Sequence, residues 1–252
     1  MKKTLSILIL ALLPLAAMAD DARATAAQGD EMYRQGNYGE AIAHYNEVVE
    51  GAGLCSAELY YNLGNAYYRE GQMGRAILNY ERALRLKPNM GDARDNLALA
   101  ESRTTDRIAK LPQLFVVRWY DALRTKVTPR TWRVVWLVLL ALTGAAVVMF
   151  RMGRSAAQRK AGFGTGIAAV VLLAATSLLL IASERRYNAH AEAIVMEQAL
   201  TVKGSPEQQS VDKLLLHEGT KVVILDSLRG WYKIRIADGT TGWCEENTIE
   251  RI

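Results

Sequence analysis

Apolar and small residues recur at helical spacing between residues 57 and 89, in the stretch AELYYNLGNAYYREGQMGRAILNYERALRLKPN. The break Glu70-Gly71-Gln72 separates two such runs, and Pro88 follows the second. The pattern predicts a helix, a turn and a second helix. Three small residues would let these helices approach closely: Gly64, Ala76 and Ala83.

The same pattern occurs once upstream, at Gly29, Met32, Gly36, Tyr38, Ala41, Tyr45 and Val48. Downstream, Asp92 to Arg103 carries apolar residues on one face only, which predicts a capping helix. The order and spacing resemble the tetratricopeptide repeat, whose helix pairs bury their apolar faces by stacking on neighbours. We therefore predict an all-α tetratricopeptide array of about two and a half repeats over residues 22–105.

In repeats of this kind the first helix of each pair lines the concave face. By this resemblance the candidate peptide-binding groove consists of Asp30, Tyr33, Arg34, Tyr61, Asn65, Tyr68 and Arg69. Tyrosines supply rigid contact area, Asn can hydrogen-bond a peptide backbone and Arg can pair with a carboxylate. The alternative is that the tyrosines are ordinary half-buried residues and the charges are solvated. Outer surfaces of such repeats also bind partners.

The chain begins with Lys2 and Lys3, an apolar run from Leu5 to Leu15, and the small-x-small triplet Ala17-Met18-Ala19. This pattern predicts a secretory signal peptide over residues 1–19, with an uncleaved anchor helix as the alternative. The array would then begin outside the cytoplasm.

Two further segments are strongly apolar, and neither Val134–Phe150 nor Phe163–Ala182 contains a charged residue. Each is long enough to cross the apolar core of a bilayer, about 30 Å. We predict transmembrane helices over residues 132–150 and 163–182, with buried helices of a soluble domain as the alternative. The loop between them, residues 151–162, has four basic and no acidic residues, which favours the cytoplasmic side.

Basic residues also precede the first apolar segment, so charge alone leaves the orientation open and the signal peptide decides it. We predict an inner-membrane protein with two spans and both folded domains on the periplasmic side. Residues 106–162 hold 11 basic and 2 acidic residues, so the pI of about 9.2 reflects membrane flanks and argues against a nucleic-acid partner. Residues 106–131 form either an amphipathic juxtamembrane linker or a plain connector.

Residues 190–252 alternate apolar and polar positions in short runs rich in Val, Ile and Thr, which predicts about five strands. Their motifs are Gly204-Ser205-Pro206, Gly230-Trp231-Tyr232-Lys233-Ile234 and Asp238-Gly239-x-x-Gly242-Trp243. These resemble the bacterial SH3-like fold and imply an all-β barrel that binds cell-wall peptides or protein segments. Trp231, Tyr232 and Trp243 are its candidate aromatic surface. The alternative places them in the core of a small barrel.

No catalytic pattern is found. The histidines His44, His190 and His217 lie in three regions, and no triad, phosphate-binding loop or metal-ligand spacing surrounds them. We expect a non-enzymatic protein without cofactor or metal. Cys55 and Cys244 are the only cysteines, both on the predicted exported side, and the sequence leaves open whether they pair.

The whole order is signal peptide, tetratricopeptide array, span, short basic loop, span and SH3-like barrel, a multidomain membrane protein. It resembles the BatE family, the tetratricopeptide-repeat and SH3-like proteins of the Bacteroides aerotolerance (Bat) operon. The resemblance implies an inner-membrane adaptor or scaffold in a stress or oxygen-tolerance complex, with von Willebrand A-domain membrane proteins of the same operon as partners. The alternative is a peptidoglycan-binding or wall-sensing envelope protein led by the SH3-like domain.

Overall fold

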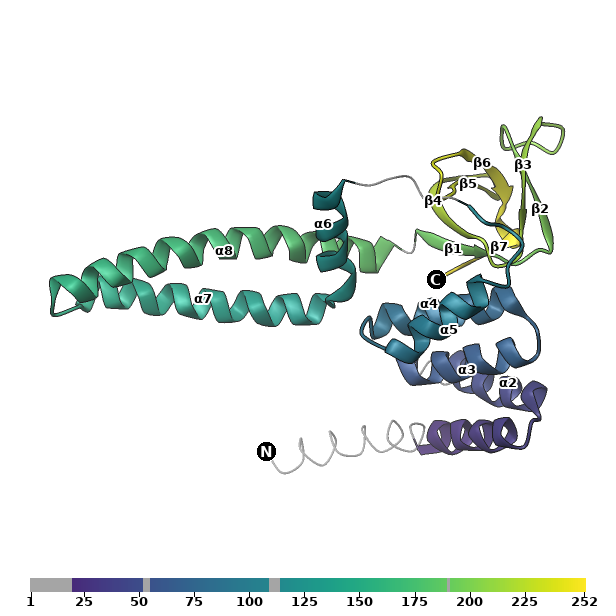
Figure 1. Ribbon diagram of the computed structural model, residues 1–252, viewed down its shortest axis with the longest axis horizontal. Coiled ribbons are helices and arrows are strands. Elements are labelled where there is room, and N and C mark those ends of the chain that lie inside the picture. The colour runs from purple at the N-terminus through teal and green to yellow at the C-terminus, as the bar shows by residue number, and fades with distance from the viewer. Residues whose placement is uncertain (1–19, 52–54, 109–113, 190) are drawn as a thin grey trace, which may run out of the picture. The chain divides into compact units, whose positions relative to one another are not determined.

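The computed structural model describes residues 20–51, 55–108, 114–189 and 191–252, and the predicted signal peptide (1–19) lies outside them. The chain divides into two compact units (Figure 1). One joins the N-terminal helices to the C-terminal strands, and the other holds the helices between residues 112 and 190.

The N-terminal helices form two antiparallel pairs and a final helix. They are a helix over residues 20–34, α2 (Tyr38–Asn46) extended by the π-helical turn η1 (Glu47–Gly51), α3 (Ala57–Arg69), α4 (Met73–Leu86) and α5 (Gly91–Glu101). Gly36 and Gly71 adopt φ of +84° and +80° in the turns of the two pairs, a conformation that favours glycine.

The two pairs repeat one close contact, which explains the small residues of the pattern. Tyr45 packs on Gly29, and Tyr80 packs on Gly64 in the next pair. A Cβ atom on these glycines would come within 2.7 Å and 2.8 Å of the respective tyrosine ring. The predicted helix-turn-helix and its small-residue packing are therefore confirmed for this stretch.

The C-terminal region is one antiparallel sheet in the order β3-β2-β6-β5-β4-β1-β7. Its strands are β1 (Glu192–Val195), β2 (Ala199–Lys203), β3 (Asp212–His217), β4 (Lys221–Leu228), β5 (Trp231–Arg235), β6 (Thr241–Glu245) and β7 (Ile249–Arg251), with a short 3-10 turn, η2 (Glu246–Thr248), before the last. The predicted all-β class is confirmed, but the structure has seven strands and not five. The two strands not predicted are β1 and β3. Three successive residues of β1 are buried and β3 holds three successive leucines, so neither shows a two-residue alternation.

The array and the barrel pack as parts of the same unit. Ile194 and Ile252 of the barrel belong to the same buried cluster as Ile77 and Leu78 of α4. A second buried cluster fills the barrel itself, built by residues such as Val202, Leu216, Val222, Ile234 and Cys244. The outer face of α4 is thus covered by the barrel.

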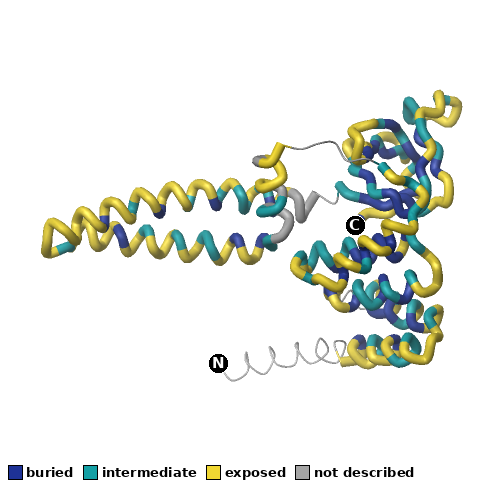
Figure 2. Tube along the Cα trace, in the orientation of Figure 1, coloured by how far each residue is buried: buried dark blue, intermediate teal, exposed yellow. Residues whose placement is uncertain are grey.

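The second unit contains α6 (Phe115–Lys126), α7 (Pro129–Met152) and α8 (Ala156–Ala189). Both α7 and α8 are long and apolar enough to cross a membrane. In the most apolar 18-residue window of each, only 6% of the residues are buried, whereas a core helix of a soluble domain would be mostly buried (Figure 2).

The helix ends differ from the predicted spans of 132–150 and 163–182. In particular, α8 begins at Ala156, inside the segment predicted as a loop over 151–162. Ser155 Oγ accepts a hydrogen bond from the Gln158 N–H at 3.1 Å, and Gln158 Oε1 accepts one from the Ser155 N–H at 3.2 Å. This reciprocal capping lets the helix begin several residues before the apolar run. A prediction based on hydropathy alone cannot detect such a cap.

Candidate functional site

A pocket of about 260 Å³ opens on the concave face of the array. It is lined by Tyr33, Tyr61, Asn65, Tyr68, Arg69, Tyr80, Asn96 and Leu99. Five of the seven predicted groove residues are among these, contributed by the first helix of each pair. The structure thus brings most of the predicted set together at one hollow.

Asp30 and Arg34 are not part of the lining. Asp30 Oδ1 accepts hydrogen bonds from the Tyr45 hydroxyl at 2.6 Å and from Asn62 Nδ2 at 3.1 Å. Arg34 pairs with Glu31, one turn earlier, at 2.6 Å. Asp30 therefore joins neighbouring helices, and Arg34 forms an exposed pair of the kind that contributes little stability.

Asn65 has a structural role that the sequence did not reveal. Its Oδ1 accepts hydrogen bonds from the Tyr80 hydroxyl and from Asn96 Nδ2, both at 2.8 Å. Burial raises the pKa of the Tyr80 phenol, so the hydroxyl stays a donor. The side-chain oxygen of Asn65 on α3 thus already links α3 to α4 and α5. The prediction that Asn65 hydrogen-bonds a peptide is therefore corrected for this oxygen.

Tyr68 is the groove tyrosine whose hydroxyl is buried without a hydrogen-bond partner among the described residues. The Arg103 guanidinium lies over its ring, 4.7 Å from the centroid, and Arg69 lies 4.6 Å from the ring centroid of Tyr38. A buried hydroxyl without a partner costs about 1–3 kcal/mol, so a bound ligand that offered it an acceptor would be favoured.

Three lining residues were not predicted: Tyr80, Asn96 and Leu99. Asn96 and Leu99 lie on α5, which the sequence presented only as a solvating cap. A polar Asn in the middle of that short helix was the available signal.

The three aromatic candidates of the barrel do not share one face. Tyr232 and Cys244 are paired neighbours on β5 and β6 and point into the core, with Tyr232 only 6% exposed. Trp231 and Trp243 occupy the alternate positions and are half-buried on the outer face. Tyr232 is therefore removed from the predicted aromatic surface, because side chains alternate along a strand.

Tyr232 still has a polar contact at its tip. Its hydroxyl donates to Glu246 and accepts a hydrogen bond from the Arg251 guanidinium at 3.0 Å. On the outer face, Lys233 Nζ lies 6.0 Å from the ring centroid of Trp243. The outer face thus combines two indole rings with a lysine.

Cys55 and Cys244 are both free thiols in the structure, the first exposed and the second buried. Burial raises the pKa of the Cys244 thiol to about 11, which leaves it unreactive at neutral pH. The two cysteines therefore do not form a bridge here.

His217 has a partner that the sequence did not indicate. Asp106 Oδ1 lies 2.7 Å from His217 Nδ1, and its Oδ2 accepts hydrogen bonds from the His217 N–H at 2.7 Å and the Thr220 hydroxyl at 2.6 Å. The segment after α5 is thereby fastened to the barrel. Within the described ranges, no group of three His, Cys, Asp or Glu side chains is placed to hold a metal ion.

Comparison with known families agrees with this architecture. The family model of the tetratricopeptide repeat matches residues 57–90, which are α3, α4 and the turn after them. The family model of the bacterial SH3 domain matches residues 213–250, from β3 to β7. The chain carries a tetratricopeptide repeat and a bacterial SH3 domain. No curated protein matches the chain.

These two domain types suggest protein-interaction or wall-binding roles. The more specific resemblance to the BatE family is not tested by the matches and stays a prediction.

Proposed function

We propose that this protein is a non-enzymatic inner-membrane adaptor that presents its tetratricopeptide groove and its SH3 domain on the periplasmic side. The two domain matches and the two helices long enough to span a bilayer support it. The order of segments and the basic residues between the two apolar runs support the orientation.

The observation that carries the adaptor function is the concave pocket with the buried, unpaired hydroxyl of Tyr68. Tyr33, Tyr61 and Tyr68 offer rigid aromatic contact area, and Arg69 at the rim adds a positive charge. An extended peptide segment supplies both a carbonyl acceptor for Tyr68 and side chains for the aromatic walls. The groove therefore suits a protein ligand.

The resemblance to the BatE family supplies the class of partner. We propose that the groove binds membrane proteins with von Willebrand A domains, within a stress or oxygen-tolerance complex. Because the cytoplasm would meet little more than the turn between α7 and α8, a cytoplasmic protein would reach the array only through the spans or through another membrane protein.

The test is in-cell crosslinking followed by affinity purification from membranes, with the chain at its native level. Arg69→Glu reverses the rim charge, and Tyr68→Phe removes the unpaired hydroxyl. The matched control is Arg94→Glu, which reverses another exposed arginine of the array, on α5. We expect recovery of membrane partners to fall about tenfold for Arg69→Glu and to persist in the control. Equal recovery from all variants would remove the groove from the proposal.

The orientation has a test of its own, since Cys55 is exposed and Cys244 is buried. A membrane-impermeant maleimide should label Cys55 in cells whose outer membrane is opened but whose inner membrane is intact. A Cys55→Ser, Ser155→Cys chain places the only exposed thiol between α7 and α8 and should be labelled only after the inner membrane is broken. The reverse pattern would invert the topology.

A second function is favoured by the outer face of the barrel, where Trp231 and Trp243 lie on adjacent strands. This pair suits a flat, partly apolar ligand such as a wall sugar-peptide. Binding of the full chain to purified peptidoglycan, lost in Trp243→Ala and kept in Trp119→Ala, would move the assignment to a wall-binding protein. Trp119 is an exposed indole on α6 and serves as the matched control.

A further inference from the structure

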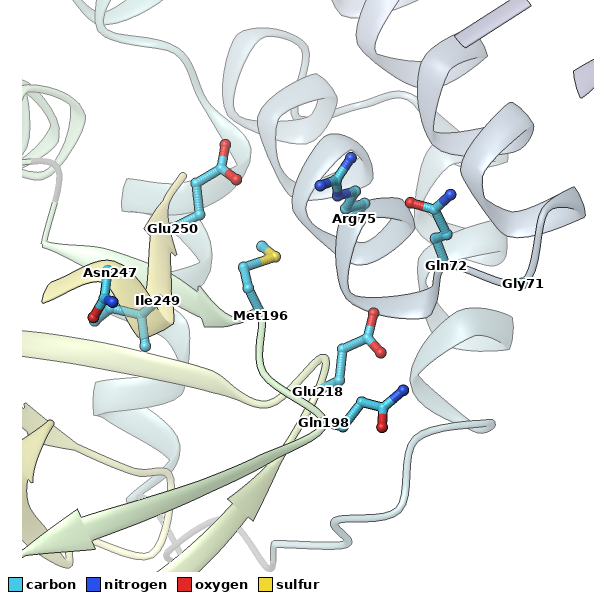
Figure 3. Close-up of a pocket in the computed structure, with 9 residues that line it drawn as sticks. All are labelled: Gly71, Gln72, Arg75, Met196, Gln198, Glu218, Asn247, Ile249 and Glu250. Carbon is cyan, nitrogen blue, oxygen red and sulfur yellow. The ribbon is translucent and has the colours of Figure 1, made fainter. Parts of the chain in front are cut away.

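A larger pocket, of about 630 Å³, lies where the array meets the barrel (Figure 3). We call it the junction pocket. The array side contributes Gly71, Gln72 and Arg75, and the barrel contributes Met196, Gln198, Glu218, Asn247, Ile249 and Glu250. Figure 3 shows Met196 between the start of α4, where Gln72 and Arg75 lie, and the strand that carries Ile249 and Glu250. Neither domain alone would form this site.

The polar groups of the junction pocket are available to a ligand. Within the part of the chain that the structure describes, the side-chain amides of Gln72, Gln198 and Asn247 make no hydrogen bond, and the Arg75 guanidinium has no ion-pair partner. The Arg75 guanidinium only approaches the Tyr67 ring, at 5.5 Å from the centroid. In the concave pocket, by contrast, Asn65 and Asn96 already bind each other.

The two acids of the junction pocket are already engaged. Glu218 Oε1 accepts a hydrogen bond from the Gly74 N–H at 2.8 Å, in the first turn of α4. Glu250 pairs with Arg82 at 2.9 Å. Arg75 is the one basic residue that lines the pocket, and it can pair with one negative charge of a ligand. Glu218 has no cation partner among the described residues, so the two carboxylates disfavour a multiply charged anion such as a phosphate.

These features together define the ligand. We propose that the junction pocket binds the free carboxyl end of a short peptide. Arg75 pairs with the terminal carboxylate, and the three amides, each with a donor and an acceptor, hydrogen-bond the last peptide groups. Met196 and Ile249 provide an apolar surface for a side chain. The volume falls within the range of specific small-ligand pockets, roughly 300–1,000 Å³.

The walls of the pocket are held at fixed positions by contacts across the junction. A Cβ atom on Gly74 would come within 2.6 Å of Glu218 Cγ, so the first turn of α4 and the β3–β4 turn approach as closely as a glycine permits. Lys221 Nζ lies 2.8 Å from Glu81 and 2.9 Å from Glu192, which joins α4 to β4 and β1. The site is therefore preorganised, which lowers the entropic cost of binding.

The experiment uses the full chain in lipid nanodiscs and an array of synthetic tetrapeptides displayed with free carboxyl ends. A second array carries the same sequences as carboxyl-terminal amides. We expect binding to the free-acid array to exceed binding to the amide array by about tenfold, because one charge-assisted pair is lost in the amide. Stronger binding to sequences that end in L-alanine would indicate the end of a protein, and stronger binding to those that end in D-alanine would indicate a wall peptide. Either preference supports the site.

Two variants separate this proposal from the groove proposal. Arg75→Gln should remove the preference for a free carboxyl end, and Asn247→Ala should weaken binding without removing that preference. Arg69→Gln, at the rim of the concave pocket, should keep the preference for a free carboxyl end. Arg94→Gln, which lines neither pocket, should leave both binding and preference unchanged. Equal binding to the two arrays, no binding to either, or loss of the preference in Arg69→Gln and not in Arg75→Gln would overturn the proposal. The adaptor function would survive each of these results.

Discussion

The array-barrel unit and the helical pair α7–α8 place their apolar residues in opposite ways (Figure 2). In the first unit, large residues such as Tyr45, Tyr80, Ile194 and Ile234 are almost fully buried. In the second, Val, Leu, Ile and Phe side chains face outward, and the few buried positions include Ala146, Ala169, Thr176 and Ser183.

The polar side chains differ in the same way, because in the second unit they lie between the two helices. Between α7 and α8, Trp136 Nε1 donates a hydrogen bond to Ser177 Oγ at 2.8 Å, and Arg133 pairs with Glu184 at 3.3 Å. Helices in lipid gain nothing from hiding apolar side chains from their surroundings, so small and polar residues make their contacts. The difference between the two units is the one expected if α7 and α8 lie in lipid, as proposed above.

The largest expected effect tests the buried core of the array-barrel unit. Tyr80→Ala should cost about 3–5 kcal/mol of the free energy of unfolding, because it empties the contact with Gly64 and removes one of the two donors to Asn65 Oδ1. Urea titration of the full chain, followed by circular dichroism and tryptophan fluorescence, measures it. Leu137→Ala, on the exposed face of α7, should leave this transition in place. A loss below about 1 kcal/mol for Tyr80→Ala would contradict the packing argument.

The next prediction compares two leucines of nearly equal exposure in the two units. Leu172 on α8 is 53% exposed and Leu215 on β3 is 52% exposed. Leu172→Arg should cost about 2.5–3.5 kcal/mol of membrane insertion, whereas Leu215→Arg should change stability by no more than about 0.5 kcal/mol. The fraction of chain retained in carbonate-washed membranes measures insertion. If both variants stay in the membrane fraction equally, the outward-facing apolar residues of α7 and α8 do not reflect a lipid environment.

A smaller effect is expected at the contact between array and barrel. Burial disfavours the charged form of Lys221, but the carboxylates of Glu81 and Glu192 outweigh it and keep the pKa of this ammonium above its ordinary value. Lys221→Met should cost about 1–2 kcal/mol, because two carboxylates lose their shared partner. Adding Glu81→Gln should restore part of the loss in a double-mutant cycle. Strictly additive effects would show that the triad does not couple α4 to the barrel.

The smallest effect concerns pH. Burial raises the pKa of Asp106, but hydrogen bonds from Thr220 and His217 outweigh it and hold that pKa below its ordinary value. The resulting stability is complete above about pH 3.9, the ordinary pKa of Asp. It is lost as the pH falls below that value toward the folded-state pKa.

Asp106→Asn should therefore cost about 1 kcal/mol at pH 7 and flatten the loss of stability below about pH 4. Thermal unfolding between pH 2 and pH 7 measures both. Asp95→Asn, an exposed acid on α5, is the control and should keep the acid sensitivity of the unsubstituted chain. An unchanged acid profile in Asp106→Asn would show that other carboxylates govern it.

Local patterns were enough to predict most of the elements. Helical spacing and Gly71 identify α3 and α4, and the alternation of residues 231–235 identifies β5. The phase of that alternation was also present, because Tyr232 and Ile234 share the apolar face and Trp231 and Lys233 the other. Treating the three aromatic residues as one surface ignored this signal.

The concave pocket could be predicted in part, because the repeat fixes which helix faces inward. The roles of Asp30 and Asn65 could not, since each depends on a partner from another helix whose position no local pattern records.

By itself the sequence determined the helices, five of the seven strands, the two apolar segments and their order along the chain, because each depends on spacing within a short stretch. Only the tertiary structure decided that the array and barrel share a core and enclose a pocket. The contacts responsible join residues far apart along the chain, such as Gly74 with Glu218 and Glu81 with Lys221. Such pairs follow no period, since the complementarity of two folded surfaces brings them together.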